Sequence, residues 1–201
     1  MNYKFKPMTF NIEELKEKAK NGDGFACYIV ARSYDSGENG VEQDLKEAFY
    51  WYHQGTLLGD PKCMYGVGAC YYFGDYVQKN EEYAKIMFVA AYPKLLKEVD
   101  EIDDLKKQSF TKFCLGAYYY FGFGEVAKDD KMAFILIAEA ARQGHIAAIY
   151  DLGANFYYNG VGTSKNLELS KYFLTVAADA GLPRAIKKLE EYQDTYNKHI
   201  K

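Results

Sequence analysis

Apolar side chains recur every three or four positions along this chain, and glycine-rich breaks separate the apolar segments. Over residues 145–158 the apolar stripe includes Leu152 and Phe156, a spacing that places both on one helical face. Residues 159–162 read Asn-Gly-Val-Gly and end this helix, because Gly and Asn accept the left-handed backbone found at helix ends. A second stripe follows over residues 167–180. The pattern predicts two helices joined by a glycine turn.

The same two-helix unit recurs along the chain. A shift of about 37 residues superposes Gly181 on Gly144 and Leu152 on Leu115, which is the kind of fixed period that repeat proteins show. Neither helix of the unit can bury its apolar stripe alone, so the copies must stack on one another. We place the repeats near residues 22–58, 59–107, 108–143 and 144–180.

The second helix of each copy has a capping residue in the same position. A carboxylate or amide oxygen at that position can accept a hydrogen bond from an unpaired backbone N–H of the first turn. Four matches in four copies indicate where these helices begin. The four residues are Asp44, Asn80, Asp129 and Asn166.

Three segments fall outside the regular repeat. Residues 1–21 are predicted to form an N-terminal arm and a capping helix, and residues 181–201 a C-terminal capping helix, because an uncapped terminal repeat exposes its core face. About eleven residues are inserted near residues 92–108, where apolar residues keep helical spacing. Pro93 would kink this segment or mark a break. It is either a lengthened helix pair or a protruding contact for a partner.

The repeated pattern resembles the Sel1-like repeat, a relative of the tetratricopeptide repeat. In the third copy Leu115-Gly116, Tyr119 and Gly122 carry the pattern, which covers roughly residues 22 to 190 of the chain. The second copy departs from it where Leu95 replaces the closing glycine, and the fourth copy has a shifted turn. The resemblance implies an all-α, right-handed α-α superhelical solenoid of about ten helices. It also implies adaptor roles in signalling, complex assembly, host–microbe contact or toxin–immunity pairing.

Composition narrows the choice of partners and compartment. The net charge of the 201 residues is −3 and no cluster of Lys or Arg stands out, which argues against nucleic acid and anionic membranes as partners. No apolar run reaches the length of about 18 residues that a membrane span needs. The first residues lack the apolar core of a signal peptide, so we expect a cytoplasmic protein. Abundant Lys, Asn, Tyr and Ile suggest a bacterial source.

Chemistry-bearing motifs are scarce. Some secreted relatives of the repeat family join the two helices of each copy by a disulfide, but here every cysteine lies on a first helix, so we expect buried free thiols. The chain has no C-x-x-C motif, no paired His and no nucleophile–base set, so we expect no metal, no cofactor and no enzymatic activity. The cysteines are Cys27, Cys63, Cys70 and Cys114.

Twenty tyrosines are the most unusual feature of the composition. By analogy with tetratricopeptide packing, two columns of the first helices face the concave side of the solenoid, and rings there make good binding anchors. The first column is Tyr28, Tyr65, Phe113 and Tyr150, the second is Asp35, Tyr72, Tyr120 and Tyr157, and Arg32 lies between them in the first copy. These rings either bind a partner or only pack between layers.

We therefore expect a non-catalytic protein–protein interaction module that binds a peptide or protein partner of unknown identity on its concave aromatic face. Three alternatives stay open. The groove could form a small-ligand receptor or an enzyme, the protein could be an immunity-type binder of a toxin or effector, or it could act through self-association.

Overall fold

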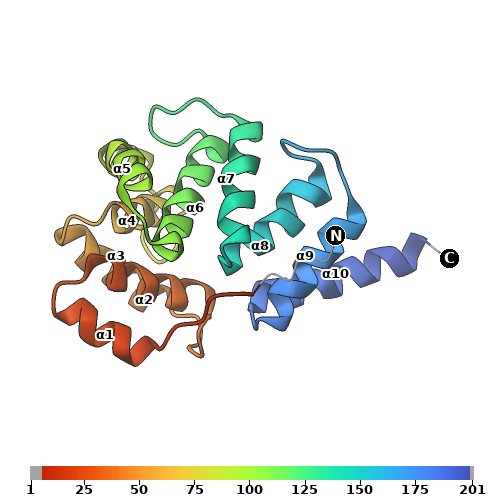
Figure 1. The fold of residues 1–201 in the computed structure, drawn as a ribbon, viewed down its shortest axis with the longest axis horizontal. Coiled ribbons are helices and arrows are strands. Elements are labelled where there is room, and N and C mark those ends of the chain that lie inside the picture. The colour runs from red at the N-terminus through yellow and green to blue at the C-terminus, as the bar shows by residue number, and fades with distance from the viewer. Residues whose placement is uncertain (1–5, 200–201) are drawn as a thin grey trace.

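A computed structural model describes the backbone of residues 6–199 and the side chains of residues 6–192, so part of the predicted arm (1–5) and the last two residues (200–201) lie outside the described residues. The chain is an all-α solenoid of ten α-helices over this range, as the repeats predicted (Figure 1). In chain order the elements are α1 (Ile12–Lys20), α2 (Gly24–Ser36), α3 (Leu45–Leu57), α4 (Pro61–Phe73), α5 (Glu81–Glu101), α6 (Leu105–Phe121), α7 (Asp130–Arg142), α8 (Ile146–Asp151), the π-helix η1 (Leu152–Tyr157), α9 (Leu167–Asp179) and α10 (Pro183–His199).

The predicted capping residues lie at the N-termini of the second helices. The carboxylate of Asp44 accepts from the backbone N–H groups of Lys46 and Glu47, both at 3.0 Å. Equivalent caps precede α5, α7 and α9, and Asn11 caps the predicted N-terminal helix. The prediction of helix starts is confirmed.

The glycine of each Leu-Gly pair explains how the two helices of a repeat approach each other. A Cβ atom added at Gly116 would lie 2.8 Å from the side chain of Ile137 on the paired helix. At Gly153 it would lie 2.9 Å from the side chain of Leu174. Both distances are shorter than real Cβ contacts allow, so only glycine permits this packing.

The inserted segment lengthens α5 and α6. Pro93 lies inside α5 without ending it, and the helices separate only at residues 102–104. The extension packs against the first helix of its own repeat, because Leu95 is fully buried and Glu98 forms an ion pair with the buried ammonium group of Lys62 on α4. The segment therefore forms a lengthened helix pair, the first of the two interpretations.

The first helix of the fourth repeat contains one residue more than the first helices of the other copies, and the loop after it is one residue shorter than in the third repeat. The backbone N–H of Asn166 donates to the carbonyl of Tyr157, as that of Asp129 does to the carbonyl of Tyr119, each at 2.9 Å. Tyr157 is thus the equivalent of Tyr119. Since the Leu-Gly pairs still align, the sequences Leu-Gly-Ala-Tyr-Tyr-Tyr and Leu-Gly-Ala-Asn-Phe-Tyr-Tyr differ by Asn155. The π-helix η1 accommodates the extra residue.

The two ends of the solenoid contact each other. The segment before α1 crosses to the fourth repeat, where the backbone N–H of Met8 donates to the carbonyl of Gly144 at 3.0 Å (Figure 1). Two residues later, the N–H of Phe10 donates to Oδ1 of Asn39 at 3.0 Å. This closure brings the first repeat and the start of α10 to the same central space.

Candidate functional site

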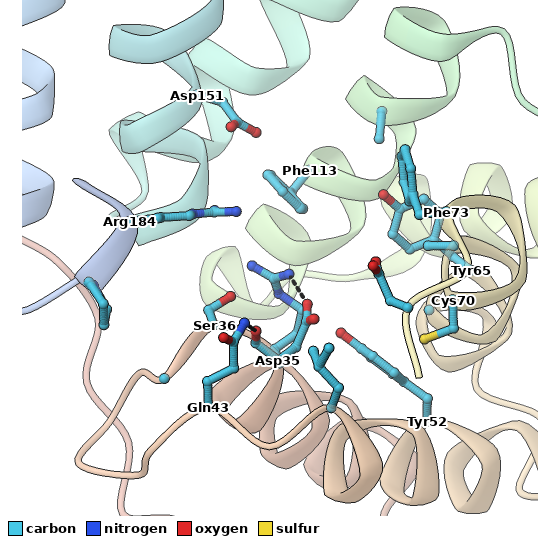
Figure 2. A pocket seen from close by; sticks show the side chains of 18 of the residues that line it. Asp35, Ser36, Gln43, Tyr52, Tyr65, Cys70, Phe73, Phe113, Asp151 and Arg184 are labelled. Carbon is cyan, nitrogen blue, oxygen red and sulfur yellow. Dashed lines mark hydrogen bonds and ion pairs between the residues drawn. The ribbon is translucent and has the colours of Figure 1, made fainter. Parts of the chain in front are cut away.

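A cavity of about 880 Å³ lies at the centre of the solenoid. Its walls come from α2, α4, α6 and the α8–η1 segment, which are the first helices of the four repeats, and from the start of α10. We call it the central cavity. Figure 2 shows Asp151 and Arg184 entering it from one side of the view and Tyr52 and Cys70 from the other.

Five of the nine residues predicted for the concave face line the central cavity. They come from three different repeats, so the stacking of first helices brings together positions that are far apart in the sequence. These residues are Arg32, Asp35, Tyr65, Phe113 and Tyr120.

The prediction that Tyr28 lies on the concave surface is wrong. Its side chain has no exposed surface, and its hydroxyl lies 3.5 Å from Sγ of Cys114 in the core. The ring of Phe110, on the inserted segment's longer helix, packs edge-on against it at 5.9 Å. The lengthened α6 therefore covers the position that faces the cavity in the next repeats.

Three further predicted residues lie outside the cavity wall. Tyr72 packs edge-on against Phe123 at 5.0 Å, and Tyr150 packs under the guanidinium group of Arg184 at 4.4 Å. Tyr157 stacks on Phe173 with ring centroids 5.5 Å apart. Its assignment to the second column was wrong because Asn155 shifts the register by one position, which gives Tyr158 that place.

Aromatic rings and small residues form most of the cavity wall. Ala69 and Ala117 line it together with the rings of Tyr65 and Tyr120. Tyr52, on α3, adds another ring that the sequence reasoning missed, because only first helices were considered. Phe113 is 7% exposed and stacks on the ring of His145 at 4.4 Å.

A charged cluster lies beside these rings. Nη1 of Arg32 forms an ion pair with Asp35 at 2.9 Å, and its Nη2 lies 3.8 Å from Oε1 of Glu38. The amide of Gln43 donates to the backbone carbonyl of Asp35 at 2.8 Å and holds the loop after α2 against the cluster. Nη2 of Arg32 and Oε1 of Glu38 are buried and have no hydrogen-bond partner among the described residues.

Arg184 provides a second guanidinium group. Its Nε and Nη2 are buried and, within the described part of the chain, neither atom has a hydrogen-bond partner. The face of its guanidinium lies 4.4 Å from the ring of Tyr150, which fixes its orientation. The sequence reasoning missed Arg184 because α10 was considered only as a cap. The sequence signal that could have identified Arg184 was its position directly after Pro183, in the first turn of that helix.

Asp151 and Asn155 form a polar pair in the cavity wall, and Asp151 lies on the same side of the view as Arg184 (Figure 2). Nδ2 of Asn155 donates to Oδ1 of Asp151 at 3.2 Å, and both side chains line the cavity. The π-helix η1 begins directly after Asp151 and contains Asn155. Such segments inside α-helices are frequent at functional sites. The sequence signal was an acidic residue in a column otherwise occupied by Ile29, Gly66 and Cys114.

Burial shifts the pKa of two carboxyl groups near the cavity. Burial raises the pKa of the Asp151 carboxyl, although Arg184 and Arg32 lower it. Burial likewise raises the pKa of the Glu38 carboxyl against the effect of the same two arginines. Both guanidinium groups therefore lie close enough to act on both carboxyls.

Residues 6–192 contain no group of three or more His, Cys, Asp or Glu side chains placed to hold a metal ion. All four cysteines are buried free thiols, as predicted. No helix in the described range of the chain is long and apolar enough to cross a membrane.

Comparison with known protein families identifies the repeat. A sequence model of the Sel1 repeat matches residues 24–60, 61–92, 115–145 and 146–182, more than half of the chain. The chain belongs to the Sel1 repeat family. Sel1 repeat proteins generally mediate protein–protein interactions, and the family is typically a non-enzymatic scaffold.

Individual relatives are distant. Chitin synthase regulatory factor 1 of Schizosaccharomyces pombe is 26% identical over 161 residues, which cover 80% of this chain and 32% of that protein. The chain thus spans about a third of the length of this relative. A Sel1 repeat protein from Oxalobacter formigenes has a solved structure that is 23% identical, with a TM-score of 0.40 over 90% of this chain and 48% of that one. The protective antigen c5321 of uropathogenic Escherichia coli, which displays an SLR fold, is 24% identical, with a TM-score of 0.44 over 90% of this chain and 36% of that one.

Proposed function

We propose that this chain is a non-catalytic interaction module that binds a segment of a protein partner in its central cavity. The cavity's aromatic wall is the observation that carries the proposal. Tyr65, Tyr120 and Tyr52 come from three helices and converge on one space. Rings of this kind offer a large contact area with few rotatable bonds and a polar tip. The general role of Sel1 repeat proteins in protein–protein interaction supports the same conclusion.

Selection from a displayed peptide library tests this function directly. We expect the full chain to retain peptides, and we expect Tyr65→Ala with Tyr120→Ala to weaken the binding of those peptides by about 2 kcal/mol or more, as loss of central anchor rings does. Tyr50→Ala is the matched control, because Tyr50 is 51% exposed and lies outside the cavity wall. Peptides that bind the double variant as tightly as the wild type would show that the cavity is not the binding site.

The volume of the central cavity favours a second candidate, a small-ligand receptor. A cavity of about 880 Å³ falls in the range of about 300–1,000 Å³ that is typical of small-molecule sites. Under this alternative, a metabolite of the source organism would occupy the space that we assign to a peptide segment. The library selection separates the two, because a receptor for small molecules alone would retain no peptides.

A further inference from the structure

Arg184 has an unusual environment for a buried guanidinium group. Nε and Nη2, its two buried atoms without a hydrogen-bond partner among the described residues, lie on the same edge of the guanidinium plane. The N–H bonds on this edge are parallel, and two parallel N–H donors match the two oxygens of a carboxylate. Across the described part of the chain, no carboxylate lies within ion-pair distance (4.0 Å) of Arg184.

The surroundings of Arg184 hold this edge in place. Tyr150 packs against the face of the guanidinium at 4.4 Å, and Pro183 begins α10 beside the loop that contains Gly37. A side chain fixed in this way loses little conformational freedom when it binds a ligand. Arg184 also lines the central cavity, and the guanidinium end of its side chain points toward it (Figure 2).

None of the described acidic groups around the cavity pairs with Arg184. Asp35 is paired with Arg32 at 2.9 Å, and Glu38 also lies beside Arg32, at 3.8 Å. Burial raises the pKa of Asp151 and of Glu38, although Arg184 and Arg32 lower both. Glu42 and Asp75 also border the cavity, but both are exposed to solvent, as is Lys187. Among the described residues, the Nε–Nη2 edge of Arg184 therefore has no carboxylate partner of its own.

We propose that the segment bound in the central cavity presents a carboxylate, and that the Nε–Nη2 edge of Arg184 binds this carboxylate in bidentate geometry. The proposal rests on the proposed function and specifies the chemistry of its ligand. Arg32 also lines this cavity and is a second guanidinium group there, with an Nη2 that has no hydrogen-bond partner in the described range. The aromatic wall then contacts the apolar body of the segment.

Two sources could supply this carboxylate, the end of a chain or an acidic side chain. NMR titration of the full chain distinguishes them with three probes: N-acetyl-phenylalanine, its amide, and the α-amide of N-acetyl-glutamic acid. We expect the free acid to bind at least about tenfold more tightly than its amide, because only the acid can accept from Arg184. Comparable binding of the glutamic acid α-amide would assign the carboxylate to a side chain, and weaker binding would assign it to a chain end.

Variants of Arg184 provide the second test. Arg184→Gln is expected to weaken the acid by about tenfold or more and to leave the amide unchanged, whereas Arg184→Lys keeps the charge without the paired donors and recovers only part of the loss. Lys188→Gln is the matched control, since Lys188 follows on the same helix, pairs with Glu191 at 3.2 Å and lies outside the cavity wall. The wild-type comparison of acid and amide needs no variant, so it decides the matter even if Arg184→Gln fails to fold.

The outcomes separate this inference from the function on which it rests. Equal binding of acid and amide to the wild type, or full binding of the acid by folded Arg184→Gln, overturns the inference. If selected peptides nevertheless depend on Tyr65 and Tyr120, the interaction module stands without a carboxylate requirement. If the acid binds through Arg184 and no peptides are retained, the carboxylate site stands and the cavity serves a small acid instead.

Discussion

Nδ2 of Asn155 donates to Oδ1 of Asp151 at 3.2 Å, and this bond joins the extra residue in the first helix of the fourth repeat to an acidic residue of the central cavity. The π-helix from Leu152 to Tyr157 exists because Asn155 is inserted into a pattern that the other repeats keep without it. The insertion therefore changes the register, the helix type and the polarity of the cavity wall together.

Deletion of Asn155 tests that relationship. The sequence would return to the pattern of the third repeat, so we expect a regular α-helix and a folded protein. The melting temperature should change by less than about 4 °C, since about 1 kcal/mol corresponds to about 2–4 °C for a chain of this size. Binding of selected peptides should fall, because Asp151 loses its partner. A large loss of helicity by circular dichroism would show that the insertion is needed for folding instead.

Truncation of Leu152 should be costly. Its side chain is 2% exposed and packs in the core of the last two repeats, so Leu152→Ala is expected to lower the free energy of unfolding by about 2–5 kcal/mol. Leu57→Ala is the control, because Leu57 is 69% exposed and should change stability by less than about 0.5 kcal/mol. Urea unfolding measures both, and a neutral result for Leu152 would contradict the packing described above.

Tyr28 should behave as a core residue and not as a binding residue. Because it is fully buried against Tyr52 and Phe110, Tyr28→Ala is expected to cost about 3–5 kcal/mol of stability, as loss of a buried ring does. Tyr120→Ala, at the half-buried cavity wall, should cost much less. Similar losses for the two variants in urea unfolding would mean that Tyr120 is also a core residue.

His145 should make stability depend on pH. Burial lowers the pKa of His145 well below its usual 6.5, and Arg32 and Arg184 lower it further. The unfolded chain therefore binds a proton near pH 6.5 that the folded chain does not, so folding stability falls as the pH drops below about 6.5. Comparison of urea unfolding at about pH 7.5 and pH 5 measures this loss.

His145→Asn is the variant that isolates this contribution. Nδ1 of His145 accepts from the backbone N–H of Ala148 at 3.2 Å, and an Asn side chain can cap the same helix start without titrating. The wild type should lose more stability than this variant between the two pH values. Equal losses would assign the pH dependence to groups other than His145. Glu38 and Asp151 would not be among them, because burial raises their pKa and acidification therefore favours the folded state.

The fold was predictable from the sequence because each repeat contains the local sequence pattern that defines its two helices. The N-cap column at Asp44 and its equivalents depends on local pattern, and the structure confirms it. Register within a repeat was also predictable until Asn155, where one inserted residue moved Tyr157 out of its expected column.

The cavity was less predictable because it depends on closure. Arg184 reaches the centre only because the segment containing Met8 contacts the fourth repeat and because α10 packs beside the first repeat. Tyr28 is buried because the lengthened α6 places Phe110 against it. Such contacts join residues that are more than 80 positions apart, and the pattern of a single repeat carries no information about them.

Calorimetric titration of one selected peptide into three proteins tests the central claim most directly. The proteins are the wild type, the double variant Tyr65→Ala with Tyr120→Ala, and Tyr50→Ala. We predict that the peptide binds the wild type and Tyr50→Ala equally and binds the double variant more weakly by about 2 kcal/mol or more, a factor of about thirty in affinity. Equal affinity for all three folded proteins would contradict the claim that the central cavity is the binding site.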